Sequence, residues 1–319
     1  MNLLNDIFYN RKYVELYLKD NEEIFEFEYK QKNFYFYNIS IKRPILKVGN
    51  IEIKEKIYDL ESAYGYGGFV SNTNDKSFIY NALEEYKKEC QKQNIIAEFM
   101  RFHPFNEFSK EVFDFCILDR NVVVKNLNED IISSYVSKVR NIVKNSLKKL
   151  EIRESKNINK FIELYYYTMQ KNGADNFYFF EKNYFNNLLN LKNVKLYEVK
   201  YNDKIIAMAF FIFSEFGYYH LSANSELSYK LNANYALLHK GFEEAKNLGI
   251  EYFILGGGLS GDENDSLYKF KKKFSNITKP FYIAGNIYNK EKYDYLNNLW
   301  LKQSKQDIKY FLKYRLEIK

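Results

Sequence analysis

The chain has 319 residues, of which 46% are hydrophobic and 28% are charged, so it can form a folded core and disorder is not expected. Its longest apolar run, Ile205 to Phe213, is far shorter than the roughly 20 residues of a membrane-spanning helix. The N-terminus lacks the apolar segment of a signal peptide. These features predict a cytoplasmic protein without a membrane span, and the length suggests two domains.

The charge and the rare residue types restrict the kinds of site. The net charge of +7 allows anionic partners without requiring them. Two cysteines exclude a cysteine-ligated zinc site and argue against a disulfide framework. Three scattered histidines argue against a histidine-based metal site. We therefore expect no metal.

The first half of the chain predicts strands around one long helix. Alternating apolar residues at 25–29 and the run FYFYNISI flank the polar segment KQKN, which indicates a hairpin with one buried face. A helix is expected over 77–93, followed by strands over 95–101 and 113–118. Asn128 to Asp130 offers a cap for the next helix, whose apolar stripe is Val136, Val139, Val143, Leu147 and Leu150.

The second half alternates helices and strands. Three strands are expected within Val194–Asn224, because the turns at Asn202-Asp203 and at 215–217 divide that apolar stretch. The other expected elements are helices over 156–170, 181–191, 233–248 and 266–274, strands over 252–255 and 280–286, and C-terminal helices. An antiparallel meander joined to a βαβ crossover predicts the α/β class with a mixed sheet (α+β in character).

Seven of the 13 glycines fall in two clusters. The first is Tyr64-Gly65-Tyr66-Gly67-Gly68, and the second is Gly256, Gly257, Gly258 and Gly261. Glycine permits positive φ and close approach of the backbone to a ligand, so the clusters predict two shaped loops. The first cluster is not a phosphate-binding Walker A or dinucleotide motif, and its glycine–aromatic alternation suits a loop that holds a planar or sugar group.

The segment HLSANSELSYKLNANYALLHKGFEEAKNLGIEYFILGGG, followed by SLYKFKKKFS, resembles the C-terminal part of the FemABX family, a branch of the GNAT acyltransferase superfamily. YGYGG and RFHPF resemble segments of related proteins found with cell-surface glycan synthesis. The resemblance implies two tandem GNAT-like domains packed together. Residues 1–128, completed by 287–319, would form the N-terminal domain, and residues 129–286 the acyltransferase domain.

What the resemblance implies is an acyl or aminoacyl transferase that acylates a primary amine on a cell-envelope precursor, nucleotide- or lipid-linked, in peptidoglycan or surface-glycan synthesis. No cofactor would be tightly bound, and the acyl donor would be aminoacyl-tRNA or acyl-CoA. Two alternatives stay open: an acyl-CoA-dependent N-acyltransferase of an amino sugar for surface polysaccharide, and a non-catalytic GNAT-like module that binds an anionic glycan or RNA. The oligomeric state is unknown.

The resemblance places Lys271 where it contacts the phosphates or developing charge of a substrate, as an ammonium group beside a reaction centre does. The alternative is that Lys269, Lys271, Lys272 and Lys273 form a solvated face, with Phe270 and Phe274 as its core stripe. We favour this alternative for Lys272 and Lys273. His220, near a strand end, is the second catalytic candidate, since an imidazole there can accept a proton from an attacking amine. A packed strand histidine is the alternative.

The remaining candidates are substrate-binding residues. Arg101 and His103 at one strand end can bind phosphate or carboxylate, although a structural Glu98–Arg101 ion pair explains the arginine as well. For Arg140 the alternative is a solvated basic helix face. The resemblance implies that the first glycine cluster lines the acceptor pocket. At the next position, where relatives often have proline, this chain has Phe69. The full set is Tyr64, Gly65, Tyr66, Gly67, Gly68, Arg101, His103, Arg140, Ser222, Asn224, Gly257 and Phe270.

Two features bear on mechanism and donor. Many family members carry an acid in the strand before the second glycine cluster, where this chain has Ile254, so a mechanism that uses that acid fails here. The turn Tyr229 to Asn234 lacks the glycines with which GNAT enzymes bind pyrophosphate, which disfavours acetyl-CoA. A long charged hairpin for tRNA is missing as well, so the sequence leaves the donor open. Asp262, Glu263 and Asp265 can include a base, or form a polar loop.

Overall fold

The computed structural model describes residues 2–306 and 308–318, in two compact units. Unit 1 comprises the residues up to Ile7 and Arg120–Lys279. Unit 2 comprises Phe8–Asp119 and the residues from Pro280 onward. Each unit is therefore assembled from two separate stretches of the chain.

Two strands carry the chain across two of the three borders between the units. The first border lies between Ile7 and Phe8, β8 (Phe115–Asn126) contains the second, and β14 (Thr278–Ile287) contains the third. At the last two borders the chain passes between units within a strand, whereas the sequence suggested borders after residues 128 and 286. Because each strand continues across its border, no linker in the sequence marks the change of unit.

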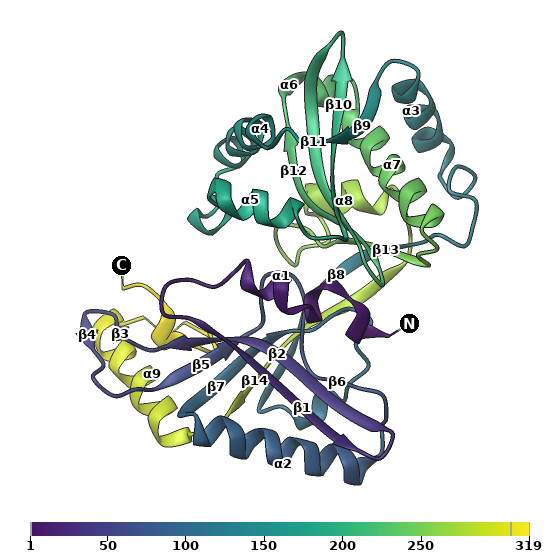
Figure 1. The fold of residues 1–319 in the computed structure, drawn as a ribbon. Helices are drawn as coiled ribbons and strands as arrows, with labels where there is room; N and C mark the ends of the chain where they lie inside the picture. Colours follow the sequence, from purple (N-terminus) through teal and green to yellow (C-terminus); the bar gives the residue numbers. More distant parts are fainter. Residues whose placement is uncertain (1, 307, 319) are drawn as a thin grey trace. The chain divides into compact units, whose positions relative to one another are not determined.

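The helices and strands of the described residues are labelled in Figure 1. The α-helices are α1 (Arg11–Glu15), α2 (Lys76–Lys92), α3 (Ser137–Leu147), α4 (Ile158–Lys171), α5 (Lys182–Leu189), α6 (Glu226–Lys230), α7 (Ala233–Asn247), α8 (Ser266–Lys272) and α9 (Lys290–Ser304). The other strands are β1 (Glu23–Gln31), β2 (Phe34–Pro44), β3 (Lys47–Val48), β4 (Ile51–Glu52), β5 (Tyr58–Glu61), β6 (Val70–Ser71), β7 (Ile95–Arg101), β9 (Glu151–Ser155), β10 (Val194–Tyr201), β11 (Lys204–Phe213), β12 (Gly217–Asn224) and β13 (Tyr252–Gly256).

The sheet of unit 1 has the strand order β8-β13-β12-β11-β10-β9. β12 and β13 are parallel, and the other neighbours are antiparallel. Phe210 packs against Phe161 of α4, whereas Phe211 belongs to the core formed with α7. Successive strand residues point to opposite faces, so α4 and α7 cover opposite faces of this sheet, as Figure 1 shows.

The sheet of unit 2 has the strand order β1-β2-β5-β7-β14. Only β5 and β7 pair in parallel in this series. Met100 of β7 packs in the core with Tyr86 of α2, and the neighbouring Phe99 packs in the core with Trp300 of α9. Both units thus have a mixed sheet with helices, and the expected α/β class is confirmed.

Two local predictions fail. The helix expected directly behind Asn128–Asp130 begins only at Ser137, because the Asp130 carboxylate closes a tight turn by accepting the Ser133 N–H at 2.7 Å. Val136 and Leu147 are exposed, so the apolar stripe is narrower than predicted. Strand β9 was not predicted, since its residues are mostly charged and exposed, and its pairing with β10 defines it.

Candidate active site

Strand β12 carries a β-bulge at His220. Phe210 pairs with Leu221 and Phe211 pairs with Tyr219, which leaves His220 as the extra residue. A bulge interrupts the ladder and redirects a side chain, and bulges are frequent beside active sites. The bulge therefore sets the direction of the His220 side chain separately from the regular alternation of β12.

The His220 imidazole is half-buried, and its Nε2 lies 3.3 Å from the hydroxyl of Tyr184 on α5. Burial lowers the pKa of His220 to about 3. The ring is therefore neutral at physiological pH and holds an added proton weakly. This geometry suits a hydrogen-bonding group better than the general base that the sequence suggested.

The strands β12 and β13 separate after a short contact. Within the described residues they pair only at Gly217 with Phe253 and at Tyr218 with Ile254. Ser222 and Asn224 lie on the part of β12 that follows. Ser222 is half-buried, whereas Asn224 is buried.

Asn224 fastens the end of β12. Its backbone N–H donates to the Thr168 hydroxyl at 2.8 Å, and its Oδ1 accepts from the Ser228 hydroxyl at 3.2 Å. These contacts join β12 to α4 and α6. The structure therefore explains Asn224 by local packing, independently of any substrate.

The second glycine cluster forms the loop between β13 and α8, and Lys271 closes it. The Lys271 ammonium donates to the Gly257 carbonyl oxygen at 2.6 Å, and the residue is only 8% exposed. Gly256 has a φ of +80°, which favours glycine. Burial lowers the pKa of Lys271 to about 8, with Asp265 opposing and Arg120 reinforcing the shift.

Two further side chains hold the same loop. Arg120 Nη1 donates to the Gly258 carbonyl at 2.9 Å, and Asp265 accepts the backbone N–H of Leu259 at 3.0 Å and of Tyr268 at 2.9 Å. Burial of Asp265 opposes ionisation, yet these backbone N–H groups lower its pKa. Asp265 is thus the cap of α8, which supports the polar-loop interpretation over that of a base.

Arg120 is the residue that sequence reasoning missed. A Cβ atom on Gly257 would lie 2.7 Å from Arg120 Cδ, so the absence of a side chain at Gly257 admits the arginine. The signal in the sequence is weak, because Arg120 stands alone among strand residues 138 positions away from its partner Gly258. Only the pairing of β8 with β13 brings the two together.

Phe270 and Arg140 are both anchored in unit 1. The Phe270 ring packs against Tyr235 at 5.2 Å and Phe274 at 5.4 Å between centroids, so it contributes to the core. Arg140 Nη2 donates to the Tyr135 carbonyl at 3.0 Å, and its buried Nε has no hydrogen-bond partner among the described residues. The Arg140 side chain is therefore packed against the protein, whereas its neighbouring lysines are solvated.

In unit 2 the first glycine cluster lies beside the end of β7. The His103 N–H donates to the Gly67 carbonyl at 3.1 Å, and the Tyr66 and His103 rings are 5.3 Å apart. Gly68 has a φ of +91°, and a Cβ atom there would lie 2.9 Å from the Phe102 ring. Tyr64 accepts a hydrogen bond on its carbonyl from Tyr13 at 3.0 Å. The predicted shaped loop is present, and its glycines meet backbone and packing constraints.

Arg101 pairs with Glu61, which makes the expected Glu98–Arg101 ion pair wrong. Arg101 Nη2 lies 2.6 Å from Glu61 Oε1, and Arg43 contacts the same carboxylate. Burial opposes ionisation of Glu61, but both guanidinium groups hold its pKa below the ordinary value. Residues three apart on a strand point to opposite faces, so Glu98 and Arg101 cannot meet.

The charges around Arg101 form a network. Asp59 accepts from Arg43 Nε at 2.8 Å and from Arg315 Nε at 2.8 Å. Three arginines thus share two carboxylates in this network, and Arg101 is its most exposed arginine, at 30% of the side chain. The excess positive charge favours an anionic group near Arg101.

His103 is buried and neutral. Its Nδ1 accepts the Phe105 N–H at 3.1 Å across the turn at Pro104, and burial lowers its pKa to about 3. A neutral imidazole adds no charge for binding phosphate. Binding of phosphate or carboxylate by Arg101 and His103 therefore stays a prediction, in which Arg101 supplies the positive charge.

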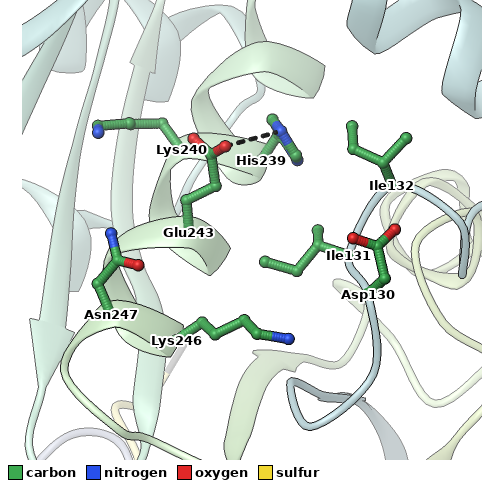
Figure 2. A pocket seen from close by; sticks show the side chains of 8 residues that line it. All are labelled: Asp130, Ile131, Ile132, His239, Lys240, Glu243, Lys246 and Asn247. Atoms are coloured by element: carbon green, nitrogen blue, oxygen red, sulfur yellow. Dashed lines mark ion pairs between the residues drawn. The ribbon is translucent and has the colours of Figure 1, made fainter.

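A pocket of about 440 Å³ in unit 1 contains none of the predicted residues. Figure 2 shows it between α7 and the segment 130–132, with the His239 imidazole 3.4 Å from Glu243. Its charged side chains are two lysines, one aspartate and one glutamate, so they give no net preference for an anion. The lining residues are Asp130, Ile131, Ile132, His239, Lys240, Glu243, Lys246 and Asn247.

The described residues contain neither a metal-binding cluster nor a helix able to span a membrane. No cluster of three or more histidine, cysteine, aspartate or glutamate side chains within residues 2–306 and 308–318 is arranged to bind a metal ion. In that same part of the chain, no helix combines the length and the apolar character needed to span a membrane.

Comparison with known proteins identifies the fold. The solved structure of FemX superposes with a TM-score of 0.69 at 14% identity, over 92% of this chain and 94% of FemX. The chain has the FemX fold. The resemblance to the FemABX-like branch is thus confirmed at the level of the fold, although no family model and no curated protein matches the sequence.

Two lysylphosphatidylglycerol synthetase structures share the fold less closely. L-PGS from Bacillus licheniformis has a TM-score of 0.52 at 14% identity, over 85% of both chains. The C-terminal domain of a putative synthetase from Agrobacterium fabrum has a TM-score of 0.51 at 12% identity, over 84% of this chain and 85% of that one. At such identities the likeness concerns the fold alone.

Proposed function

We propose that this protein is an acyltransferase that transfers an aminoacyl or acyl group to a primary amine on a cell-envelope precursor. The observation that carries the proposal is the buried Lys271 ammonium, held on the glycine loop of a FemX-like fold. Burial disfavours the charged form of a lysine, so a buried ammonium requires nearby negative charge to stay protonated. An anionic substrate or a developing oxyanion provides that negative charge.

The reaction is a direct attack of a neutral amine on the carbonyl carbon of the donor. The C–N bond forms as the ester or thioester bond of the donor breaks, and the amine proton passes to the departing oxygen or sulfur. Lys271 stabilises the negative charge on the carbonyl oxygen or on the donor phosphates. His220, neutral and paired with Tyr184, orients a substrate polar group by hydrogen bonding.

The other candidate residues have proposed roles in binding or in shaping the site. Arg120 and Asp265 keep the loop that carries Gly257 in place, so that Lys271 has a fixed position. Arg140 and Ser222 supply polar groups for the donor or acceptor. In unit 2, Arg101 and the Tyr64–Gly68 loop bind the acceptor, with Arg101 facing its anionic part. Asn224, Phe270 and His103 act by shaping the fold.

An acyl-CoA-dependent N-acyltransferase of an amino sugar is the second candidate. Asn232, in the turn that lacks glycine, has a φ of +56°, the left-handed conformation that glycine usually provides. The α7 helix begins at the next residue, Ala233. The turn therefore presents a helix N-terminus despite its sequence, which weakens the argument against a pyrophosphate-containing donor.

The decisive experiment compares Lys271→Ala with Lys269→Ala, an exposed lysine on the same helix. Turnover would be measured with UDP-linked muramyl peptide or an amino sugar as acceptor and with aminoacyl-tRNA or acetyl-CoA as donor. We expect Lys271→Ala to lower kcat by about 10²–10³-fold, the usual cost of removing one transition-state partner. We expect Lys269→Ala to keep wild-type turnover.

Two results would contradict the proposal. Equal turnover of both variants would remove Lys271 from the reaction. Saturable binding of the muramyl peptide without transfer from either donor would indicate a non-catalytic binding module. Transfer from acetyl-CoA alone, to an amino sugar, would establish the second candidate instead.

A further inference from the structure

An exposed aromatic patch lies on α4 and α6 of unit 1. It consists of Tyr167, Lys171, Leu227 and Tyr229. The tyrosines are 41% and 49% exposed, and Leu227 is 37% exposed. Exposed apolar residues are ordinary singly, but a group on two adjoining helices indicates a contact surface.

A lysine joins the two tyrosine rings. The Lys171 ammonium lies 5.2 Å from the Tyr229 ring centroid and 5.9 Å from that of Tyr167. Glu226 stands beside it, 3.7 Å from Lys171 and within 3.3 Å of the Tyr167 hydroxyl. The patch therefore combines two aromatic faces with a cation, and the exposed Lys230 next to Tyr229 adds a second one.

The patch is attached to the end of β12. Thr168, the neighbour of Tyr167, accepts the Asn224 N–H at 2.8 Å, so α4 is tied to the last residue of the strand. α6 begins two residues later, and its C-terminal end leads through Asn232 into α7. The patch thus adjoins both the diverging part of β12 and the start of α7, where the proposed donor binds.

We propose that the aromatic patch binds the adenosine at the end of the acyl donor, with Lys171 and Lys230 on the adjoining phosphates. The inference rests on the proposed function and deepens it. Both donor classes share this chemistry, since tRNA ends in an adenosine and CoA contains a phosphorylated one. Tyrosine faces bind a base by stacking, and lysines attract the phosphates.

The test measures binding to the whole protein, so it does not depend on turnover. The ligands are CoA, an RNA hairpin with a single-stranded ACCA 3′ end, and the same hairpin ending in ACC. The variants are Tyr229→Ala, Tyr229→Phe and Lys171→Ala. Tyr80→Ala is the matched control, because Tyr80 is a 64% exposed tyrosine on a helix of unit 2.

We expect Tyr229→Ala to weaken binding of the adenosine-ended ligand by about tenfold, the equivalent of one lost stacking contact. Tyr229→Phe and Tyr80→Ala should bind as wild type does, and the ACC hairpin, which lacks the terminal adenosine, should bind Tyr229→Ala and wild type equally. Lys171→Ala should weaken binding and reduce its salt dependence. If the hairpin alone responds, the donor is a charged tRNA, and if CoA alone responds, it is an acyl-CoA.

The inference is overturned if Tyr229→Ala binds both adenosine-containing ligands like wild type. It is also overturned if Tyr229→Ala loses the ACCA and ACC hairpins equally, since the terminal base would then make no contact. Adenosine-dependent binding by Tyr229 together with unaltered turnover of Lys271→Ala would preserve this inference while refuting the proposed reaction. The two failures are therefore distinguishable.

Discussion

Glu98 in unit 2 and Lys271 in unit 1 are both buried ionisable groups, and they differ in how many hydrogen bonds they form. In unit 2 the carboxylate of Glu98 is fully buried and accepts four hydrogen bonds, from Asn38 at 2.8 Å, Ser40 at 3.0 Å, Tyr86 at 2.7 Å and Tyr288 at 2.8 Å. In unit 1 the Lys271 ammonium donates one hydrogen bond among the described residues, to Gly257. Burial raises the pKa of Glu98 and lowers that of Lys271.

The comparison distinguishes a buried group whose hydrogen bonds are complete from one that can still donate. The two Glu98 oxygens have two donors each, so the group is satisfied within the fold. An ammonium has three hydrogens to donate, and one acceptor leaves capacity for a substrate. A buried charge with its hydrogen bonds complete stabilises a fold, whereas a buried charge with capacity left over is a candidate for chemistry.

The largest expected effect on stability comes from Glu98. Glu98→Leu removes the acceptor that Ser40, Tyr86, Tyr288 and Asn38 share, although Asn38 still donates to Ser40 and Tyr86. We expect it to lower the free energy of unfolding by about 3 kcal/mol or more. Chemical denaturation measures this, with Glu85→Leu on the exposed face of α2 as control. A loss below about 1 kcal/mol would show that water replaces the carboxylate and that the contrast with Lys271 is false.

For Lys271 we expect an effect on the pH dependence of activity. Its charged form is disfavoured by burial, so the ammonium is lost as pH rises through about 8, below the ordinary lysine value. We expect kcat/KM, calculated for the neutral form of the acceptor amine, to be maintained below pH 8 and to fall about tenfold per pH unit above it. A profile that stays flat to pH 10 would mean that the reaction does not use the ammonium.

Substitution of Arg120 tests the same pH profile of kcat/KM. Because its positive charge lowers the pKa of Lys271, Arg120→Gln should move the alkaline fall in kcat/KM to higher pH. It should also reduce kcat by about tenfold, since the Gly258 carbonyl loses its clamp. Arg120→Lys keeps the charge and should leave the position of the fall unchanged. A purely structural arginine would lower kcat without moving the profile.

The smallest expected effect is that of His220. With a pKa of about 3 it carries no charge at neutral pH, so His220→Asn should lower kcat by less than about fivefold and add no change in the profile between pH 5 and 8. Tyr184→Phe, which removes its partner hydroxyl, should have a similar effect. A loss of a hundredfold or more in His220→Asn would restore the general-base role.

Sequence reasoning predicted most elements because their signals are local. The β1–β2 hairpin, the meander of β10 to β12 and the end of α7 at Gly249 follow from alternation, turn residues and a glycine stop. It failed where a partner decides the outcome. β9 is polar and becomes a strand through β10, and Asp130 caps a turn instead of a helix.

In the candidate site, too, some residues have a local signal in the sequence and others do not. Lys271 and the two glycine clusters stand out in the sequence through a family resemblance and composition. The partners of these residues do not, because Arg120 reaches Gly258, and Arg101 reaches Glu61, only after strands distant in the sequence have paired.

By itself the sequence determined the α/β class, the order of most elements and the residue types at the two loops, since these depend on periodicity and on glycine. The tertiary structure decided which charges are satisfied and which retain capacity. It made Glu98 a buried acceptor instead of a partner for Arg101, and it made His103 and His220 neutral. Among the described residues it gave Lys271 one acceptor, Gly257. The physical reason is that burial and hydrogen-bond completion are properties of packing across the chain, which no local pattern of residues records.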